Sequence, residues 1–111
     1  MSEKDKNHLL NILDCGQVIQ DYIAGLADAD AFFSDRKTFD ATLMNFVVIG
    51  EVIGKLSAET KNEYQQIPWN RIKDFRNVVA HDYFGVDAEE VWQVVHKHLP
   101  KFLSEVQNIL N

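Results

Sequence analysis

The chain has 111 residues, the usual size of one domain, and this length supports a single hydrophobic core without disulfides or a structural metal. Its 46% hydrophobic and 25% charged residues are typical of a soluble globular protein, and no apolar run approaches the ~20 residues that span a bilayer. The net charge of −6 excludes a protein that coats nucleic acid through a broad basic surface.

Residues 9–26 are predicted to form the first helix. Apolar residues and one glycine recur there at intervals of three and four, namely Leu9, Ile12, Leu13, Gly16, Ile19, Ile23 and Leu26. This spacing places them on one face of an amphipathic helix of about five turns. The sequence Gly-Leu-Ala-Asp-Ala-Asp at residues 25–30 is expected to end it.

The second helix is predicted over residues 39–56, with Ser34 or Asp35 as its cap. Its apolar residues fall on almost every side, so either it is the central helix of a bundle or its extra face meets another chain. Gly50 and Gly54, four residues apart, allow a neighbouring helix to approach closely. Tight packing within the domain and a dimer interface both explain this glycine pair.

A short polar helical turn is predicted at residues 57–65, and a third helix starts at Pro68, which has no N–H to leave unpaired at a first helical position. After a loop at residues 82–87, Asp87 and Glu90 have the spacing of a capping box for the last helix. Pro100 removes a backbone hydrogen bond inside that helix, so a kink is expected between His96 and Pro100.

The apolar faces of these two helices follow helical spacing. They comprise Trp69, Ile72, Phe75 and Val79 in the third helix, and Trp92, Val95, Leu99, Phe102, Val106 and Ile109 in the last. The sequence therefore predicts an all-α fold, a four-to-five-helix up-and-down bundle with short connections that forms one domain over residues 1–111.

Arg76 lies inside the apolar stripe of the third helix. On a wheel of 100° per residue that starts at Trp69, Arg76 falls at about 340° and Ile72 at about 300°. A guanidinium cannot leave water without a partner, so this position requires a carboxylate, a ligand anion or a cleft at an interface. Two explanations fit the position of Arg76: a structural salt bridge to Glu51 or Asp40 of the second helix, and an anion-binding role.

His81 follows Arg76 by five residues, which places it about 140° further round if the helix continues. The two side chains converge only if the helix ends near Ala80 and the backbone turns. The position of His81 is also explained without a function, because the helix dipole favours a histidine at a carboxyl end. The position of Tyr83 is also that of a packed aromatic residue with its hydroxyl at the surface. Residues 69–83 carry a net charge of +1 and the rest of the chain −7, so this segment is the best candidate for a local anion site.

No metal or cofactor is expected. His96 and His98 are two apart and point to different sides of a helix, and His8 is interpreted as a solvated histidine. Cys15, the only cysteine, is interpreted as a buried structural thiol rather than a nucleophile. A single cysteine and an amino terminus without a secretory signal favour a reducing cytoplasm.

The sequence Arg-Asn-Val-Val-Ala-His-Asp-Tyr, which contains Arg76, His81 and Tyr83, resembles the R-x4-H-x-Y signature of the HepT-like toxins in the HEPN superfamily. Residues 35–51, 67–77 and 83–102 also resemble family segments in order and spacing, and the likeness covers roughly residues 9–110. The resemblance implies a HEPN-like, HepT-like bundle that dimerises through its helices, with the motifs of both chains lining one cleft.

The same resemblance implies a metal-independent RNA endonuclease, the toxin of a bacterial or archaeal type VII toxin–antitoxin system. Its antitoxin would be a minimal, MntA-like nucleotidyltransferase that transfers AMP to Tyr83. Ala80 and Asp82 depart from the family pattern, in which a larger aliphatic residue and a glycine are common. Asp82 adds a negative charge beside the expected phosphate site.

In this interpretation Arg76 and His81 are catalytic residues. Arg76 holds the phosphate, and His81 exchanges protons near neutral pH. Asn77 positions backbone or substrate, and Glu51 orients Arg76. The alternatives are a non-catalytic subunit that binds a nucleotide or partner protein through Arg76 and Tyr83, and an inert helical dimer.

Overall fold

The computed structural model describes residues 1–111 and contains helices but no strand. The long helical segments are α1 (Glu3–Ile23), α3 (Arg36–Lys55), α5 (Trp69–His81), and α6 (Ala88–Gln93), which runs through a π-helical turn (Val94–His98) into α7 (Leu99–Leu110). Two short helices, α2 (Ala29–Ser34) and α4 (Ala58–Glu63), and a 3₁₀ turn (Tyr83–Gly85) connect them. The predicted all-α fold is confirmed.

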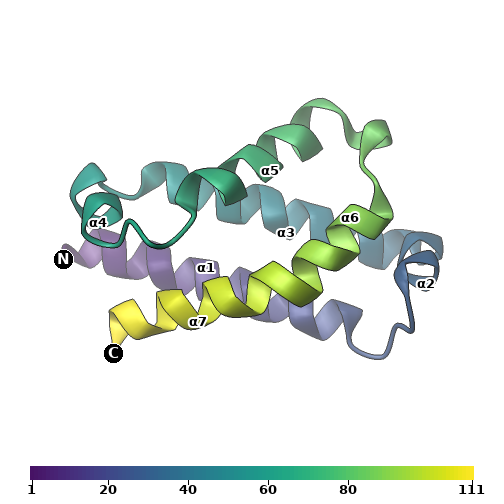
Figure 1. Cartoon of the computed structure of the whole chain (residues 1–111), viewed down its shortest axis with the longest axis horizontal. Coiled ribbons are helices and arrows are strands. Elements are labelled where there is room, and N and C mark those ends of the chain that lie inside the picture. Colours follow the sequence, from purple (N-terminus) through teal and green to yellow (C-terminus); the bar gives the residue numbers. More distant parts are fainter.

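Helix α3 is the central helix of the bundle (Figure 1). It packs along α1 and along α5, and it also contacts α2, while α7 packs on α1. Both chain termini lie at the same end of a molecule that measures 41 × 28 × 20 Å. The central position explains why α3 is apolar on most sides, because neighbouring helices cover several of its faces.

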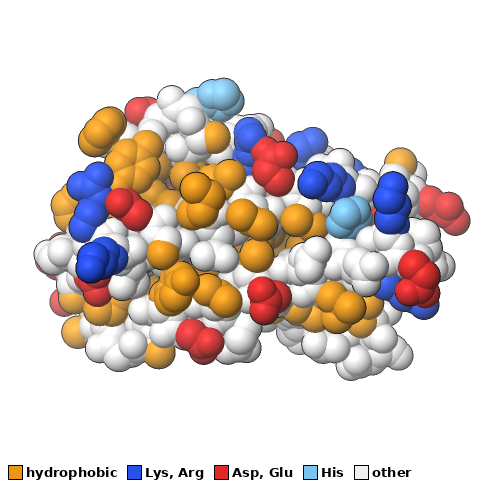
Figure 2. All heavy atoms as spheres, turned by 180° about the vertical axis from the view of Figure 1, so that it is seen from behind, with side chains coloured by type: hydrophobic (Ala, Val, Ile, Leu, Met, Phe, Trp, Pro, Cys, Tyr) orange, Lys and Arg blue, Asp and Glu red, His pale blue; other side chains and the backbone are white.

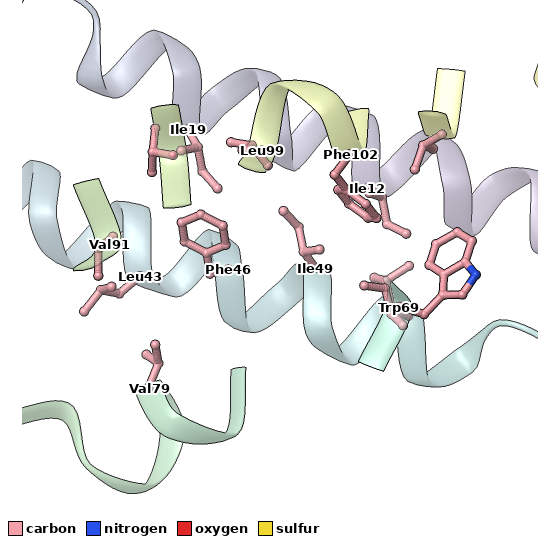
Figure 3. Close-up of a cluster of buried hydrophobic side chains, with 14 of the residues drawn as sticks. Ile12, Ile19, Leu43, Phe46, Ile49, Trp69, Val79, Val91, Leu99 and Phe102 are labelled. Carbon is pink, nitrogen blue, oxygen red and sulfur yellow. The ribbon is translucent and has the colours of Figure 1, made fainter. Parts of the chain in front are cut away.

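One hydrophobic core joins the long helices. Figure 3 shows Ile12 of α1, Phe46 and Ile49 of α3, and Phe102 of α7 turned toward one another. The ring of Phe46 meets that of Phe75 on α5 edge to face, with centroids 5.0 Å apart. Because a fully buried aliphatic or aromatic side chain contributes roughly 1.5–3 kcal/mol, this cluster is the main source of stability.

Helix α3 is capped by Asp35, one of the two residues expected for that role. Its carboxylate accepts a hydrogen bond from the Thr38 N–H at 3.2 Å. Ser34, the other candidate, is the last residue of α2, a short helix that the sequence analysis did not predict. Asp28 caps α2, and Phe32 anchors it through an edge contact with the Phe39 ring and a tilted contact with the Trp92 ring.

Helix α1 ends at Ile23, a few residues before its expected end, and Gly25 adopts a left-handed conformation with φ +88°. Because side chains disfavour this conformation, a glycine at this position allows the chain to turn. Leu26 lies beyond the helix but still packs against the core. The predicted end of the helix within residues 25–30 was therefore slightly late.

The last helical segment begins at Asp87 and is irregular where a kink was expected. Asp87 accepts a hydrogen bond from the Glu89 N–H at 2.9 Å, so it is the cap, but the bond reaches Glu89 rather than Glu90 as in a capping box. At the π-helical turn the Leu99 N–H bonds to the Val94 carbonyl. This wider turn comes just before Pro100, whose ring nitrogen cannot donate.

No helix is both long enough and apolar enough to cross a membrane.

Candidate functional site

Arg76 lies where α5 packs against α3. Its aliphatic stem crosses Gly50, and its terminal nitrogen forms an ion pair with Glu51 on α3. The Arg76 side chain is 28% exposed, so most of it is withdrawn from water. Of the two carboxylates considered from the sequence, Glu51 is therefore the partner of Arg76, while Asp40 binds other residues.

The hydrogen bonds of Arg76 leave part of its guanidinium uncommitted. One terminal nitrogen donates to the Asn77 side-chain oxygen at 2.9 Å, and the other donates to Glu51. The Nε atom is buried and has no acceptor. Since a guanidinium has five N–H donors, two more remain, one on each terminal nitrogen. These are the donors that can bind an anion.

His81 is the last residue of α5 and is exposed. The helix runs through it, because the Asp82 N–H bonds to the Val78 carbonyl at 3.0 Å. Five helical residues correspond to a rotation of about 140°, so Arg76 and His81 lie on different sides of α5. Within one chain the structure therefore does not bring these two side chains together.

Tyr83 lies in the 3₁₀ turn and is partly buried, with its ring edge-on to Phe39 at 6.4 Å between centroids. Its hydroxyl donates to Asp40, which also accepts two bonds of 3.1 Å from the Arg36 Nε. The Arg36 guanidinium lies 5.3 Å from the centre of the Tyr83 ring. The hydrogen bond to Asp40 raises the pKa of Tyr83, since it stabilises the protonated phenol.

Sequence reasoning did not include Arg36 in the site. The i, i+4 spacing of Arg36 and Asp40 predicts their helical pairing, but nothing local shows that Tyr83, 43 residues after Asp40, lies beside them.

Asp82 has a local structural role. Its carboxylate accepts a hydrogen bond from the Gly85 N–H at 3.2 Å and so caps the 3₁₀ turn that carries Tyr83. A Cβ added at Gly85 would lie only 2.6 Å from the Asp82 Cγ, so the bond depends on a residue without a side chain. The negative charge of Asp82 is thus directed toward a backbone donor of its own turn.

The rear face of the molecule shows acidic and basic side chains interspersed with exposed hydrophobic ones (Figure 2). Several Lys and Arg side chains lie near one another in the upper right of this view, with acidic side chains among and beside them. The distribution agrees with the net charge of −6 and indicates that any RNA contact depends on a few placed cations rather than on bulk charge.

An apolar groove lies elsewhere, between α5 and the α6–α7 segment. Its volume is about 560 Å³, and its apolar lining includes Phe46 and Ile49 at α3, Phe75 and Val78 at α5, and Phe102 at α7. None of the three signature residues lines it. The groove is therefore separate from the three signature residues.

Cys15, His96 and His8, the other residues considered from the sequence, are described by their exposure and contacts. Cys15 is partly buried, and burial together with the nearby Asp14 raises the pKa of its thiol. His96 bonds through Nδ1 to the Trp92 carbonyl at 2.8 Å, and its ring contacts the Trp92 ring in a tilted arrangement. His8 is partly buried rather than fully solvated. No group of three or more potential metal ligands occurs.

Comparison with known proteins places the chain in a family. The family described as "Ribonuclease HepT-like" matches residues 12–109. The chain is 33% identical over 110 residues to a "Gamma-glutamylcyclotransferase and putative RNase" of Methanocaldococcus jannaschii, with 99% of this chain aligned. It spans 49% of that relative's length, so the relative is about twice as long.

Two further relatives match over most of their lengths. A "Putative RNase" of Methanocaldococcus jannaschii is 32% identical over 111 residues, covering 99% of this chain and 91% of the relative. A "Probable ribonuclease HepT" of Thermococcus cleftensis is 26% identical over 109 residues, covering 98% of each. No solved structure matches the chain with significance. On the extent of these matches, the chain belongs to the HepT-like ribonuclease family.

Proposed function

We propose that the chain is a metal-independent RNA endonuclease, the toxin of a type VII toxin–antitoxin system in the cytoplasm of a bacterium or archaeon. The observation that carries this proposal is Arg76, whose side chain is partly buried and whose guanidinium has one uncommitted N–H donor on each terminal nitrogen. A guanidinium that is oriented by two hydrogen bonds in this way is suited to a phosphate group. The relatives whose names contain "RNase" or "ribonuclease" support RNA as the substrate.

In the proposed reaction His81 accepts the proton of an RNA 2′-hydroxyl, and the resulting oxygen attacks the adjacent phosphorus. The bond from phosphorus to the 5′-oxygen breaks, and a protonated imidazole gives its proton to that leaving oxygen. Arg76 donates hydrogen bonds to the phosphate oxygens, whose negative charge increases in the transition state. The products are a 2′,3′-cyclic phosphate and a 5′-hydroxyl end.

The active site is proposed to form between two chains. Arg76 and His81 lie on different sides of α5, so a second copy is the simplest source of a complementary group. Met44 and Val48 are 61% and 38% exposed on α3, and they lie about two turns and one turn, respectively, before Glu51 on that helix. This apolar stripe next to Arg76 is suited to a two-fold contact that would bring two motifs together.

The test is RNA cleavage by purified protein. His81→Ala is expected to lower the rate by about 10²–10⁴-fold, because a proton-transfer group is lost. Its helical circular dichroism should not change, since His81 is exposed at a helix end. Cleavage in EDTA should equal cleavage in buffer. Loss of activity on chelation would show that the metal-free chemistry is wrong.

A second candidate function is a non-catalytic subunit that binds a nucleotide or a partner protein. The ion pair with Glu51 favours it, because this carboxylate offsets the charge of Arg76 and competes with an incoming phosphate. If the wild type binds RNA or nucleotide but cuts no RNA, this function replaces the first.

Regulation is proposed to act at Tyr83. An MntA-like nucleotidyltransferase would transfer AMP from ATP to the Tyr83 hydroxyl and release pyrophosphate, which adds a phosphate charge and bulk beside the site. Tyr83 is partly exposed, and the Arg36 cation lies beside its ring, which supports this assignment. Intact-mass spectrometry should show AMP addition to wild type and none to Tyr83→Phe. Equal labelling of both proteins would place the modification elsewhere.

A further inference from the structure

We propose that Gly50 is a positioning residue for Arg76, and that its missing side chain fixes where the guanidinium binds phosphate. The inference rests on the proposed function and deepens it. We call Gly50, Glu51, Arg76 and Asn77 the Arg76 site, since two consecutive residues of α3 and two of α5 form it.

Helix α5 approaches α3 closely at Gly50. A Cβ added at Gly50 would overlap the Cβ of Arg76 and would lie 2.7 Å from its Cγ and 3.6 Å from its Cδ. The Cβ position is set by the backbone, so no side-chain rotation moves it away. Any residue other than glycine at position 50 must therefore displace α5 from α3.

This close approach determines the surroundings of the guanidinium. Because the stem of Arg76 lies flat against Gly50, its Nε is buried, and the terminal nitrogens reach Glu51 and Asn77. The Arg76 side chain is therefore held by its contact with Gly50 and by its hydrogen bonds to Glu51 and Asn77 before any ligand binds. A cation that is already oriented loses less conformational freedom when it binds a phosphate, which favours the transition state.

The chain contains a matched control one turn further along α3. A Cβ added at Gly54 would meet only the flexible end of Lys73, 3.8 Å from its Cε and 4.0 Å from its Nζ, which is ordinary contact. Gly50→Ala and Gly54→Ala therefore add the same methyl group to the same helix. They differ in whether that group meets the stem of Arg76.

The first experiment compares RNA cleavage by the two variants. Gly54→Ala should keep the wild-type kcat/KM, while Gly50→Ala should lower it by about 10²-fold, as expected for displacement of a phosphate-binding group. In an Arg76→Lys background, which has already lost the guanidinium, Gly50→Ala should change kcat/KM by less than about threefold. Equal losses in both backgrounds would overturn the proposal in favour of a general packing role.

The second experiment needs no RNA and so separates this proposal from the proposed ribonuclease activity. The exchange of the Arg76 Nε–H with water is followed by ¹H–¹⁵N NMR, with Arg76→Lys identifying the signal. Gly50→Ala should accelerate exchange by about tenfold or more, because the Nε–H becomes exposed, and Gly54→Ala should leave it slow. Slow exchange in Gly50→Ala would overturn the proposal even if the protein cuts RNA.

A third comparison covers the case in which Gly50→Ala does not fold. Arg76→Gly removes the Cβ that the added methyl group would meet, so Gly50→Ala/Arg76→Gly should fold and be more stable to urea than Gly50→Ala alone. Failure of this double variant to recover stability would show that the obstacle at position 50 is not Arg76. If wild-type protein cuts no RNA but the exchange and urea results hold, the Arg76 site stands and only the ribonuclease activity is wrong.

Discussion

Asp5 is a buried carboxylate, 4% exposed, that ties the first turn of α1 to the start of α4. It accepts hydrogen bonds from the hydroxyls of Ser57 and Thr60 at 2.6 Å each and from the Ser57 N–H at 3.2 Å. Burial alone would raise the pKa of Asp5, but these hydrogen bonds outweigh burial and lower the pKa below its usual value. The carboxylate is therefore ionised and fully engaged in the folded protein.

Asp5→Asn should lower the free energy of unfolding at neutral pH by about 1–3 kcal/mol, because an amide cannot accept all three bonds. The pKa of Asp5 is lower in the folded than in the unfolded chain. Its stabilisation is therefore complete above the unfolded value, about 3.9, and is lost as the pH falls through the folded value. Urea unfolding should show the gap between wild type and variant narrowing in acid.

Asp14→Asn is the control for this measurement, since Asp14 is an exposed carboxylate on the same helix. Its stability should stay within about 0.5 kcal/mol of wild type. A gap between wild type and Asp5→Asn that persists unchanged at acid pH would contradict an ionised Asp5.

At the residue scale, local pattern predicted some contacts and missed others. The helical wheel placed Arg76 on the apolar side, and its need for a carboxylate led to Glu51, although Asp40 fitted equally well. The hydrogen bonds of Asp5 could not be predicted from the sequence, because its partners Ser57 and Thr60 lie 52 and 55 residues away in a polar stretch without a motif. The hydrogen bond between Tyr83 and Asp40 was not predicted either, because the two residues are 43 positions apart and meet only through helix packing.

At the scale of elements, helix starts agree with capping chemistry. Side chains of Ser2, Asp28, Asp35, Ser57 and Asp87 each accept a backbone N–H at the beginning of a helix. The residues that precede a helix therefore specify its start locally. The exceptions are α5, which follows Pro68, and α7, which continues from the π-helical turn; neither has a side-chain cap.

Asp35→Ala should destabilise the protein by about 1 kcal/mol, because it leaves the Thr38 N–H without its acceptor at the start of the central helix. Ser34→Ala should have little effect, since Ser34 ends α2 and caps nothing. Urea unfolding at neutral pH measures both. Equal losses for the two variants would mean that the capping bond does not contribute.

The glycine pair of α3, Gly50 and Gly54, shows what the pattern of a single helix cannot predict. The four-residue spacing indicated a close helix approach but did not identify the neighbour. In the structure Gly50 meets Arg76 of α5 within the same chain, whereas Gly54 remains exposed. For Gly50 the explanation by internal packing is therefore correct, because the α3–α5 contact already occupies its face.

At the scale of the whole molecule, the proposed two-fold assembly gives a further prediction. Wild type should sediment as a dimer at micromolar concentration, and Met44→Glu should sediment as a folded monomer. The introduced charge would be solvated in the monomer, where Met44 is 61% exposed, but buried against the partner chain in the dimer.

Leu10→Glu provides the matched control. Leu10 is 53% exposed on α1, a helix that is not part of the proposed contact, so this variant should remain a dimer. A wild type that sediments as a monomer throughout the concentration range would remove the case for a composite cleft. A Leu10→Glu variant that also becomes monomeric would place the contact elsewhere.

The sequence by itself determined the all-helical architecture, most helix starts, the irregular turn before Pro100 and the segment that carries the motif. These features depend on the period of apolar residues and on backbone hydrogen bonds between residues a few positions apart, and both are local.

Only the tertiary structure decided which groups meet. It pairs Arg76 with Glu51 over Gly50, joins Tyr83 to Asp40 and Arg36, and continues α5 through His81 so that this side chain points away from Arg76. It also leaves an apolar groove between α5 and α7 that no periodicity indicated. Such contacts join residues far apart in the chain, and their geometry depends on how whole helices pack, so no local spacing encodes them.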